Sequence, residues 1–492
     1  MQKNLISQET ERGTGRGSRI AKNSIFVLSA RITEALAGIV IMFVAARCLG
    51  VELFGRYSLV LAIMWVLSPF LGFRSAPHIL VREIVRDNSL AGKLIGSSLV
   101  LSGLLALPVA AAAMAAGLIL GLDAASFLAL FLTLLYFLFK AWINELTSIY
   151  IAGERMEYEA VSSYFVSLLE AASVIIVYVA GLGFLSLFIS VAVANLLGLA
   201  ITVFMVRRFD LKPVTGKIRY VFKESLPIAV SRLFTQAYLY VDVFILKLLT
   251  NDFEVGLFQA SQRIVIRLLI LPMSFGMSMM PLFSKMAGEP GGGGLKEAYD
   301  KLFKLVLLVS MLFTFIGFVL AGDIVRYLYG EPFLKAAPSL KLLFFAVPLL
   351  FLNYLSQIVN IACGKQVNVM AAEGAGLIAN AALDVALIPR YGYMGASWAT
   401  LLGCMTLFCA NFFLMPRYIF SLKMASSAIK CAAAFLIAFA TRWYFSEWNA
   451  AFAIPGGMLA AAAVLLLTGF FSSEEIRTFK RALGFKSAFS GA

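Results

Sequence analysis

Histidine is almost absent from this chain of 492 residues, which contains only His78. Histidine is the commonest general base of enzymes and a frequent metal ligand, so histidine-based acid–base and metal chemistry is nearly excluded. The sequence also has no G-x-S-x-G nucleophile motif and no Walker phosphate-binding loop. We therefore expect a protein that is not an enzyme and that carries no cofactor and no metal.

Cysteine is scarce as well. The five cysteines are scattered, and no two form a C-x-x-C pair. This pattern argues against a zinc site and against a disulfide framework. We expect packed or lipid-facing thiols at all five positions, which are Cys48, Cys363, Cys404, Cys409 and Cys431.

Charged residues make up only 14% of the chain, whereas 61% of it is hydrophobic and the mean hydropathy is +0.90. A soluble domain is about 25% charged, so this composition predicts a polytopic membrane protein. The apolar runs are about 20 residues long, which favours membrane-spanning helices over the short alternating strands of a barrel. The predicted fold class is therefore all-α.

Fourteen membrane-spanning helices can be drawn on the sequence. Each apolar run is about 17–25 residues long, as a spanning helix requires. The predicted spans are 24–46, 57–80, 94–117, 126–150, 160–180, 186–206, 225–249, 257–282, 304–322, 338–361, 369–388, 393–415, 428–446 and 452–471.

Acidic residues are outnumbered, 27 to 41, by lysine and arginine, which gives a formal net charge of +14. In a membrane protein such an excess indicates the positive-inside rule rather than binding to nucleic acid. With the N-terminus in the cytoplasm, the outward loops carry few basic residues, namely Arg47, Arg56, Arg326, Lys335 and Arg390. The sequence therefore predicts a multi-pass protein of the plasma (inner) membrane with both termini in the cytoplasm.

Two stretches match at a constant offset of 201 positions, one beginning at Lys22 and the other at Lys223. The matched pairs include Arg31 with Arg232, Gly55 with Gly256, and Tyr57 with Phe258. Spans one and seven run in the same direction, so this is a parallel repeat of the kind found in transporters. The predicted organisation is a cytoplasmic tail (1–23), two six-helix bundles (24–215 and 216–420), and two extra helices with a tail (421–492).

Proline recurs in corresponding spans of the two halves. Span two carries Pro69 and Pro77, and span eight carries Pro272 and Pro281. Proline removes a helical hydrogen bond and clashes with the preceding turn. We expect both spans to be weakened at comparable depths.

Basic residues inside the predicted spans are the main candidates for substrate contact, because burying a charge in a membrane is costly and usually functional. Arg31 and Arg232 lie at equivalent depths of the repeat, so we expect both to face one central cavity. Arginine also binds phosphate through two parallel hydrogen bonds. The predicted cationic lining consists of Arg31, Arg232, Arg263 and Arg267, assisted by Lys140 and Arg74.

Acidic residues inside the spans have two interpretations. Glu34 follows Arg31 by three residues and lies on the same helix face. It is either an ion-pair partner that lowers the cost of burying Arg31, or a proton or sodium site coupled to transport. The candidates for ion coupling are Glu34, Asp242, Glu170 and Glu373.

Several short motifs resemble the polysaccharide transporter family, the Wzx-type flippases of lipid-linked oligosaccharides. The first is LGVELFGRYS after span one (Leu49–Ser58), which fits the family pattern L-G-x-x-x-F-G-x-Y-S. The others are VREIVRD (Val81–Asp87), IAGERMEYEA (Ile151–Ala160) and IPRYGYMGAS (Ile388–Ser397). The resemblance covers roughly residues 20 to 420.

The resemblance implies the fold of the multidrug/oligosaccharidyl-lipid/polysaccharide (MOP) exporter superfamily, with two six-helix bundles around a cationic cavity. The implied substrate is a polyprenyl-pyrophosphate glycan, such as an O-antigen, exopolysaccharide, teichuronic-type or N-glycan precursor, moved to the outer leaflet by alternating access. The implied partners are the lipid bilayer and the glycan polymerase and glycosyltransferases of the same pathway, with no nucleic acid.

Three alternatives remain open from the sequence. A lipid II flippase would use the same mechanism on a peptidoglycan precursor. A multidrug-and-toxin cation antiporter would need an acidic cavity, whereas basic groups outnumber acids inside these spans. A membrane-embedded glycan polymerase or ligase would normally carry a large outward loop, and the sequence has no long one.

Overall fold

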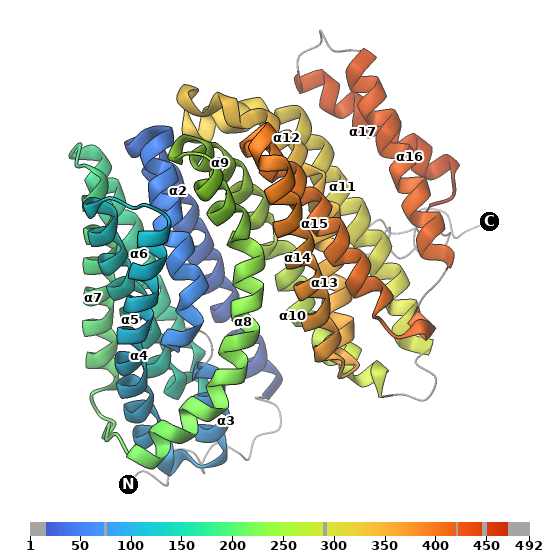
Figure 1. Cartoon of the computed structure of the whole chain (residues 1–492). Coiled ribbons are helices and arrows are strands. Elements are labelled where there is room, and N and C mark those ends of the chain that lie inside the picture. The colour runs from blue at the N-terminus through green and yellow to red at the C-terminus, as the bar shows by residue number, and fades with distance from the viewer. Residues whose placement is uncertain (1–15, 73–75, 289–292, 420–421, 445–449, 471–492) are drawn as a thin grey trace. The chain divides into compact units, whose positions relative to one another are not determined.

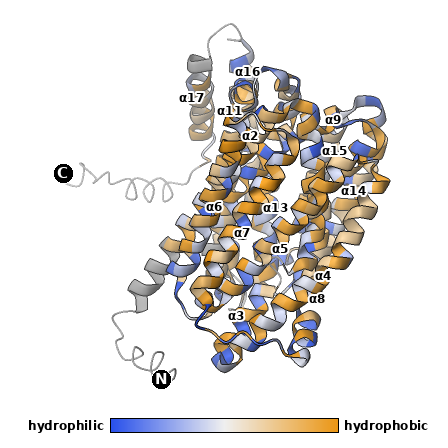
Figure 2. Ribbon diagram, turned by 90° about the vertical axis from the view of Figure 1, so that its left-hand side faces the viewer, coloured by the Kyte–Doolittle hydropathy of each residue, from blue (hydrophilic) through white to orange (hydrophobic). Residues whose placement is uncertain are grey.

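Helices form every element in the described part of the protein. The structure is a computed structural model that describes residues 16–72, 76–288, 293–419, 422–444 and 450–470 (Figure 1). Figure 2 shows hydrophobic residues along most of the length of these helices. The chain is thus an all-helical multi-pass membrane protein, which confirms the predicted fold class.

The first compact unit comprises residues 1–260 and 328–333. Within it α2 packs against α6, α5 packs against both α4 and α7, and α3 packs against α5. Figure 1 shows α4, α5, α6 and α7 side by side. Its helices are α2 (Arg16–Leu67), η1 (Ser68–Leu71), α3 (Ala76–Arg86), η2 (Asn88–Leu90), α4 (Ala91–Ile119), α5 (Ala124–Ala152), α6 (Met156–Val179), α7 (Phe184–Val206), α8 (Thr215–Leu249) and the first half of α9 (Asp252–Leu268).

The second compact unit comprises residues 261–327 and 334–492. In this unit α14 packs against α15, α13 against α15, and α16 against α17. Phe283, Tyr299 and Phe315 are fully buried in its core. The helices are the end of α9, then α10 (Ile270–Ala287), α11 (Gly293–Tyr329), η3 (Glu331–Ala336), α12 (Ala337–Phe344), α13 (Ala346–Ala362), α14 (Gln366–Tyr391), α15 (Tyr393–Phe413), η4 (Arg417–Ile419), α16 (Leu422–Tyr444) and α17 (Ala450–Leu467).

The number of spans is not settled by these helices. A helix lies over each of the fourteen predicted spans. Among the described residues, eleven helices are long and apolar enough to cross a membrane. A twelfth is the pair α12 and α13, which is bent by 45°. The count of fourteen and the predicted domain boundaries therefore remain predictions.

In both proline-containing spans, one helix ends at an equivalent position of the repeat. Helix α2 ends at Leu67 and α9 ends at Leu268, which are 201 positions apart. Pro69 lies in η1, and Pro272 lies just after the start of α10. That proline weakens both spans stays a prediction, because Leu269, between α9 and α10, keeps helical backbone angles.

The two repeats meet through a reciprocal pair of glycines within the first unit. A Cβ atom at Gly55 would lie 1.9 Å from the carbonyl oxygen of Asp252, and one at Gly256 would lie 2.1 Å from that of Val51. Val51 and Asp252 occupy equivalent positions of the repeat. Each half therefore places its glycine against the equivalent backbone carbonyl of the other half. The contact is therefore self-complementary, like that of a two-fold symmetric dimer.

Ion pairs surround this glycine contact. Arg56 donates from Nε to Asp252 at 2.8 Å and from Nη1 to Asp123 at 3.0 Å, while Lys247 lies 2.6 Å from Asp252. Hydrogen bonding from Ser126 and the charge of Arg56 hold the pKa of Asp123 below its ordinary value. Asp123 also caps α5, so one carboxylate joins the start of that helix to α2.

Candidate functional site

A chain of five charged side chains runs through the first unit, on helices α2, α5 and α6. Arg31 Nη1 donates to Glu34 Oε2 at 3.0 Å, and its Nη2 lies 3.8 Å from Glu159 Oε1. Lys140 Nζ lies 3.8 Å from Glu34 Oε1 and 3.3 Å from Glu170 Oε1. Glu34 thus links the two cations, and we call these five residues the charge network.

The buried end of the charge network is fixed by neutral partners. Lys140 donates to the hydroxyl of Tyr136, one helical turn earlier, at 3.2 Å. Asn195 on α7 donates to Glu170 Oε1 at 2.9 Å and also to the carbonyl of Val191. A buried ion pair is tolerated only when such hydrogen bonds satisfy its remaining donors and acceptors. The pair of Lys140 and Glu170 meets that condition.

Accessibility falls along the path from Arg31 through Glu34 and Lys140 to Glu170. The exposed fraction of the side chain is 56% for Arg31, 28% for Glu34, 16% for Lys140 and 7% for Glu170. A polar path therefore leads from an open guanidinium into the interior of a bundle of apolar helices. Its open end can bind an anion, and its carboxylates can bind protons or cations.

The charge balance of the network differs from the expected positive lining. We expected a cationic lining that includes Arg31 and Lys140, and these two cations here face three carboxylates. The structure therefore contains the ion pair between Glu34 and Arg31 that the first interpretation of Glu34 requires. An arriving phosphate would have to displace Glu34 or Glu159 from Arg31.

The repeat partner of Arg31 has different surroundings. Arg232 on α8 lies with its Nη2 3.4 Å from Nε2 of His78 on α3. Two turns earlier on α8, Glu224 accepts from Arg82 at 2.9 Å. The repeat therefore places an arginine at the same position in each half, but one has carboxylate neighbours and the other has an imidazole.

The second unit contains the other two arginines. Arg263 and Arg267 lie one turn apart on α9, the first half-buried and the second exposed. On α14, the buried Glu373 accepts a hydrogen bond from Gln357 at 3.5 Å.

Two further predicted residues complete the set. Asp242 is buried in α8 of the first unit, with 1% of its surface exposed. Arg74 lies outside the described residues, between the ranges that end at 72 and begin at 76.

The sequence did not reveal the partners that organise the charge network. Glu159 and Asn195 contact residues far away in the chain, so no spacing rule points to them. Tyr136 was detectable, because a residue four positions before Lys140 lies on the same helix face. The sequence also gave no special role to Glu145, a fully buried carboxyl group on α5.

Two protein-family models match parts of the chain. A family model described as polysaccharide biosynthesis protein matches residues 20–287, and one described as MatE matches residues 227–386. No curated protein sequence matches the chain significantly.

Solved structures share its fold at low sequence identity. The structure of the lipid II flippase MurJ in an inward closed conformation aligns with a TM-score of 0.70 and 14% identity, covering 93% of this chain and 99% of that one. An inward-facing MATE family multidrug resistance transporter of the MOP superfamily gives 0.66 and 14%, covering 79% and 96%. A MOP superfamily transporter from Pyrococcus furiosus gives 0.55 and 14%, covering 80% and 94%.

Proposed function

This chain belongs to the polysaccharide biosynthesis protein family, and from that premise we propose that it is a flippase for a lipid-linked glycan. It would move a lipid-(pyro)phosphate-linked oligosaccharide from the cytoplasmic to the outer leaflet by alternating access. The family match agrees with the resemblance seen in the sequence motifs. The fold shared with a lipid II flippase and with MATE transporters agrees with transport rather than catalysis.

The observation that carries the proposal is the charge network inside apolar helices. A glycan head group cannot cross hydrocarbon unaided, because each hydroxyl stripped of water costs about 4–8 kcal/mol on a cyclohexane scale. A polar path such as that from Arg31 to Glu170 replaces the lost water contacts, while the lipid tail stays in the bilayer. Intramembrane charges of this kind usually mark a substrate or ion pathway.

We assign the pyrophosphate or acidic-sugar contacts to Arg31, Arg232, Arg263 and Arg267, with Lys140 and Arg74 assisting. An arginine about 4 Å from a phosphate oxygen gains about 4 kcal/mol at an effective dielectric of 20, before desolvation. For Arg31 this gain has to exceed the attraction of the guanidinium to Glu34 and Glu159. This competition keeps phosphate binding reversible. The coupling ions would bind at Glu34, Asp242, Glu170 or Glu373.

The same proposal includes location and partners. The basic loops support insertion in the plasma (inner) membrane with both termini in the cytoplasm. The substrate would come from glycosyltransferases on the cytoplasmic side and pass to a glycan polymerase on the other.

The defining experiment is a flipping assay with the purified full-length chain in liposomes. A lipid-pyrophosphate oligosaccharide should move between leaflets, and empty liposomes are the control. Lipid II and a fluorescent organic cation are tested in parallel. Transport of the cation alone would reject a glycan flippase. A cation transporter is the second candidate, because the charge network contains three carboxylates and the MatE model matches part of the chain.

Arg267→Ala is expected to lower flipping at least tenfold while the protein inserts normally. The variant removes a guanidinium that offers two parallel hydrogen bonds to phosphate. Arg267→Lys should recover only part of the rate, because lysine lacks that paired geometry. The control is Arg390→Ala, which removes an exposed arginine at the end of α14. Full activity of Arg267→Ala would remove this residue from the site.

Arg31→Ala and Arg232→Ala are expected to slow flipping to a similar extent, because the repeat places them at equivalent positions. Both rates are measured in the same liposome assay and normalised to the amount of inserted protein. If one variant is fully active and the other inactive, the repeat equivalence of the two arginines has no functional meaning.

A further inference from the structure

A strongly basic segment joins α7 to α8 in the first unit. Residues 207–223 contain six basic side chains and one acidic side chain, and they lie between the sixth and seventh predicted spans, at the membrane surface. All of the basic side chains except Lys217 are exposed. We call this stretch the basic segment, and its cations are Arg207, Arg208, Lys212, Lys217, Arg219 and Lys223.

Few carboxylates neutralise the basic segment. Its single acid, Asp210, pairs with Lys212 at 2.7 Å, and both of these side chains are exposed. In the described ranges of the chain, no carboxylate forms an ion pair with Arg219 or Lys223, which lie one turn apart on α8. These two exposed cations are therefore available to an external anion.

The acids on the neighbouring elements are already engaged. Glu224, which follows the basic segment on α8, accepts a hydrogen bond from Arg82 of α3 at 2.9 Å. Glu83 of α3 accepts from Arg82 at 2.8 Å and from Arg86 at 3.3 Å. Asp87 caps η2 through its side chain. The electrostatic potential around the basic segment is therefore positive.

The start of α4 fixes the path of the loop between α7 and α8. A Cβ atom at Gly92 would overlap the carbonyl oxygen of Asp210, so only glycine permits this close approach. Farther along α4, the hydroxyl of Ser97 accepts a hydrogen bond from the amide of Val214 at 2.9 Å. Because both contacts involve the backbone of the loop, the basic segment has a defined position on α4.

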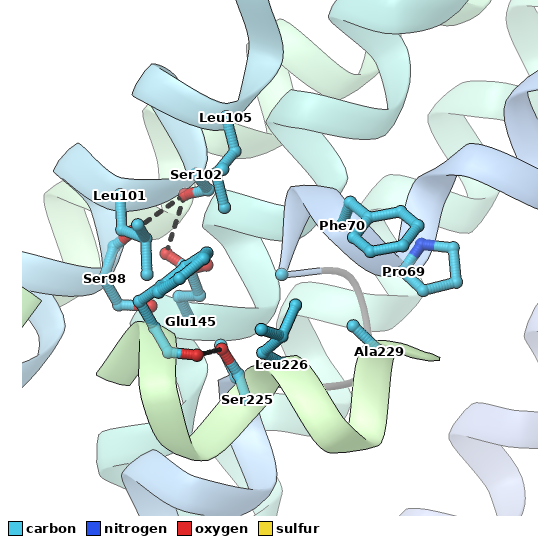
Figure 3. Close-up of a pocket in the computed structure, with 13 residues that line it drawn as sticks. Pro69, Phe70, Ser98, Leu101, Ser102, Leu105, Glu145, Ser225, Leu226 and Ala229 are labelled. Carbon is cyan, nitrogen blue, oxygen red and sulfur yellow. Dashed lines mark hydrogen bonds between the residues drawn. The ribbon is translucent and has the colours of Figure 1, made fainter. Parts of the chain in front are cut away.

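The first turns of α8 are held by one face. Val221 is fully buried in a hydrophobic cluster of residues from α3, α4 and α5, and Ile218 packs against that cluster. One turn after Val221, Ser225 lies at the same pocket as Ser98 and Ser102 of α4 (Figure 3). The charged side chains of the basic segment therefore project from a helix whose other face is anchored.

Apolar side chains border the exposed cations of α8. Phe222 lies between Arg219 and Lys223 in the chain and is 39% exposed. Leu226 is 38% exposed and continues the face of Lys223 by almost one turn. A phospholipid has the same order of groups, with a charged phosphate next to apolar chains. A soluble anion would gain nothing from the apolar neighbours, so the surface favours a lipid.

The need to orient the chain in the membrane does not account for this arrangement. The positive-inside rule acts on the basic residues of a short loop, whatever structure the loop adopts. A flexible loop would serve that purpose equally well, whereas here Gly92 and Ser97 hold the backbone in place. The fixed backbone favours a ligand that binds at a defined position.

We propose that Arg219 and Lys223 bind the phosphate of one anionic phospholipid at the membrane surface, a function that goes beyond transport and does not depend on it. The guanidinium of Arg219 offers two parallel hydrogen bonds to the phosphodiester, and the ammonium of Lys223 adds another contact. Phe222 and Leu226 lie against the first methylene groups of the acyl chains. The remaining cations of the basic segment attract anionic lipid to the site.

Native mass spectrometry of the full-length protein tests this site. The protein is incubated in detergent with equal amounts of phosphatidylglycerol and phosphatidylethanolamine, so that only the head group differs. We expect about fivefold more bound phosphatidylglycerol, because its head group alone carries a net negative charge. Equal retention of the two lipids overturns the proposal.

The double variant Arg219→Gln with Lys223→Gln should lower the amount of bound phosphatidylglycerol about fivefold, because both phosphate contacts are lost. The matched control is Lys285→Gln with Lys365→Gln, which removes two exposed lysines from the second unit and should leave binding unchanged. Thermal unfolding of each variant shows that a loss of binding is not a loss of folding. An equal loss in both double variants would indicate a general effect of charge and overturn the site.

Two single variants separate a fixed site from diffuse attraction to a positive loop. Arg219→Lys keeps the charge but lacks the paired hydrogen bonds, and Gly92→Ala displaces the loop without any change of charge. Each should lower the bound phosphatidylglycerol about twofold or more. Unchanged binding in both variants overturns a fixed site. Inorganic phosphate in large excess should not displace the lipid, and displacement would overturn the proposal in favour of a site for soluble anions.

Discussion

Gly55→Ala is expected to destabilise the protein by about 4 kcal/mol or more, which is at the upper end of single substitutions. The added methyl group would lie 1.9 Å from the carbonyl oxygen of Asp252 and 2.9 Å from the amide nitrogen of Gly256. Both are backbone atoms, so no side chain can rotate away and the two helices must separate. Separation would also stretch the hydrogen bond between Arg56 and Asp252.

Thermal and denaturant unfolding of the purified protein in detergent measure this effect. Gly256→Ala should behave alike, because its methyl group would meet the carbonyl of Val51 at 2.1 Å. The matched control is Gly322→Ala in α11, where nothing lies within 4 Å of the new Cβ atom. Alanine is the better helix former, so that variant should gain about 0.5–1 kcal/mol. Equal stability of the Gly55 and Gly322 variants would contradict the close backbone contact.

Lys140→Met is expected to cost about 3–5 kcal/mol, the usual penalty for removing one partner of a buried ion pair. It leaves Glu170, of which 7% is exposed, with Asn195 as its remaining close partner. Glu170→Met should also be damaging, because it leaves Lys140 with Glu34, 3.8 Å away, in place of its closer carboxylate. The double variant should recover most of the loss, since two apolar side chains of similar size bury no charge.

The double-mutant cycle isolates the coupling between the two residues. Its control is the exposed pair of Lys301 and Glu297, whose atoms lie 2.7 Å apart with side chains 60% and 71% exposed. Lys301→Met should change stability by about 0.5 kcal/mol or less. If the stable double variant still flips glycans at the normal rate, this pair is structural and lies outside the transport path.

The sequence predicted the features that depend on neighbouring residues or on the internal repeat. The composition predicted helices in a membrane, and helices form every element of the described residues. The offset of 201 positions linked Gly55 to Gly256 before any contact was known. Each of these inferences needs only neighbouring residues or an internal comparison.

The charge network was harder to predict, because its members come from separate helices. Lys140 was recognised as a costly buried charge, but its pairing with Glu170 depends on how α5 packs against α6. The same applies to Glu159, which faces Arg31 from the first turn of α6. Sequence therefore identified which charges needed explanation, whereas only packing could identify their partners.

The glycine contact has a consequence for the two halves of the chain. Because Gly55 meets Asp252 and Gly256 meets Val51, each half supplies the same two surfaces. Two identical copies of one half can make that contact with each other without any other specialised interface. A protein of half this length would therefore carry both surfaces of the contact, and two copies of it could pair symmetrically.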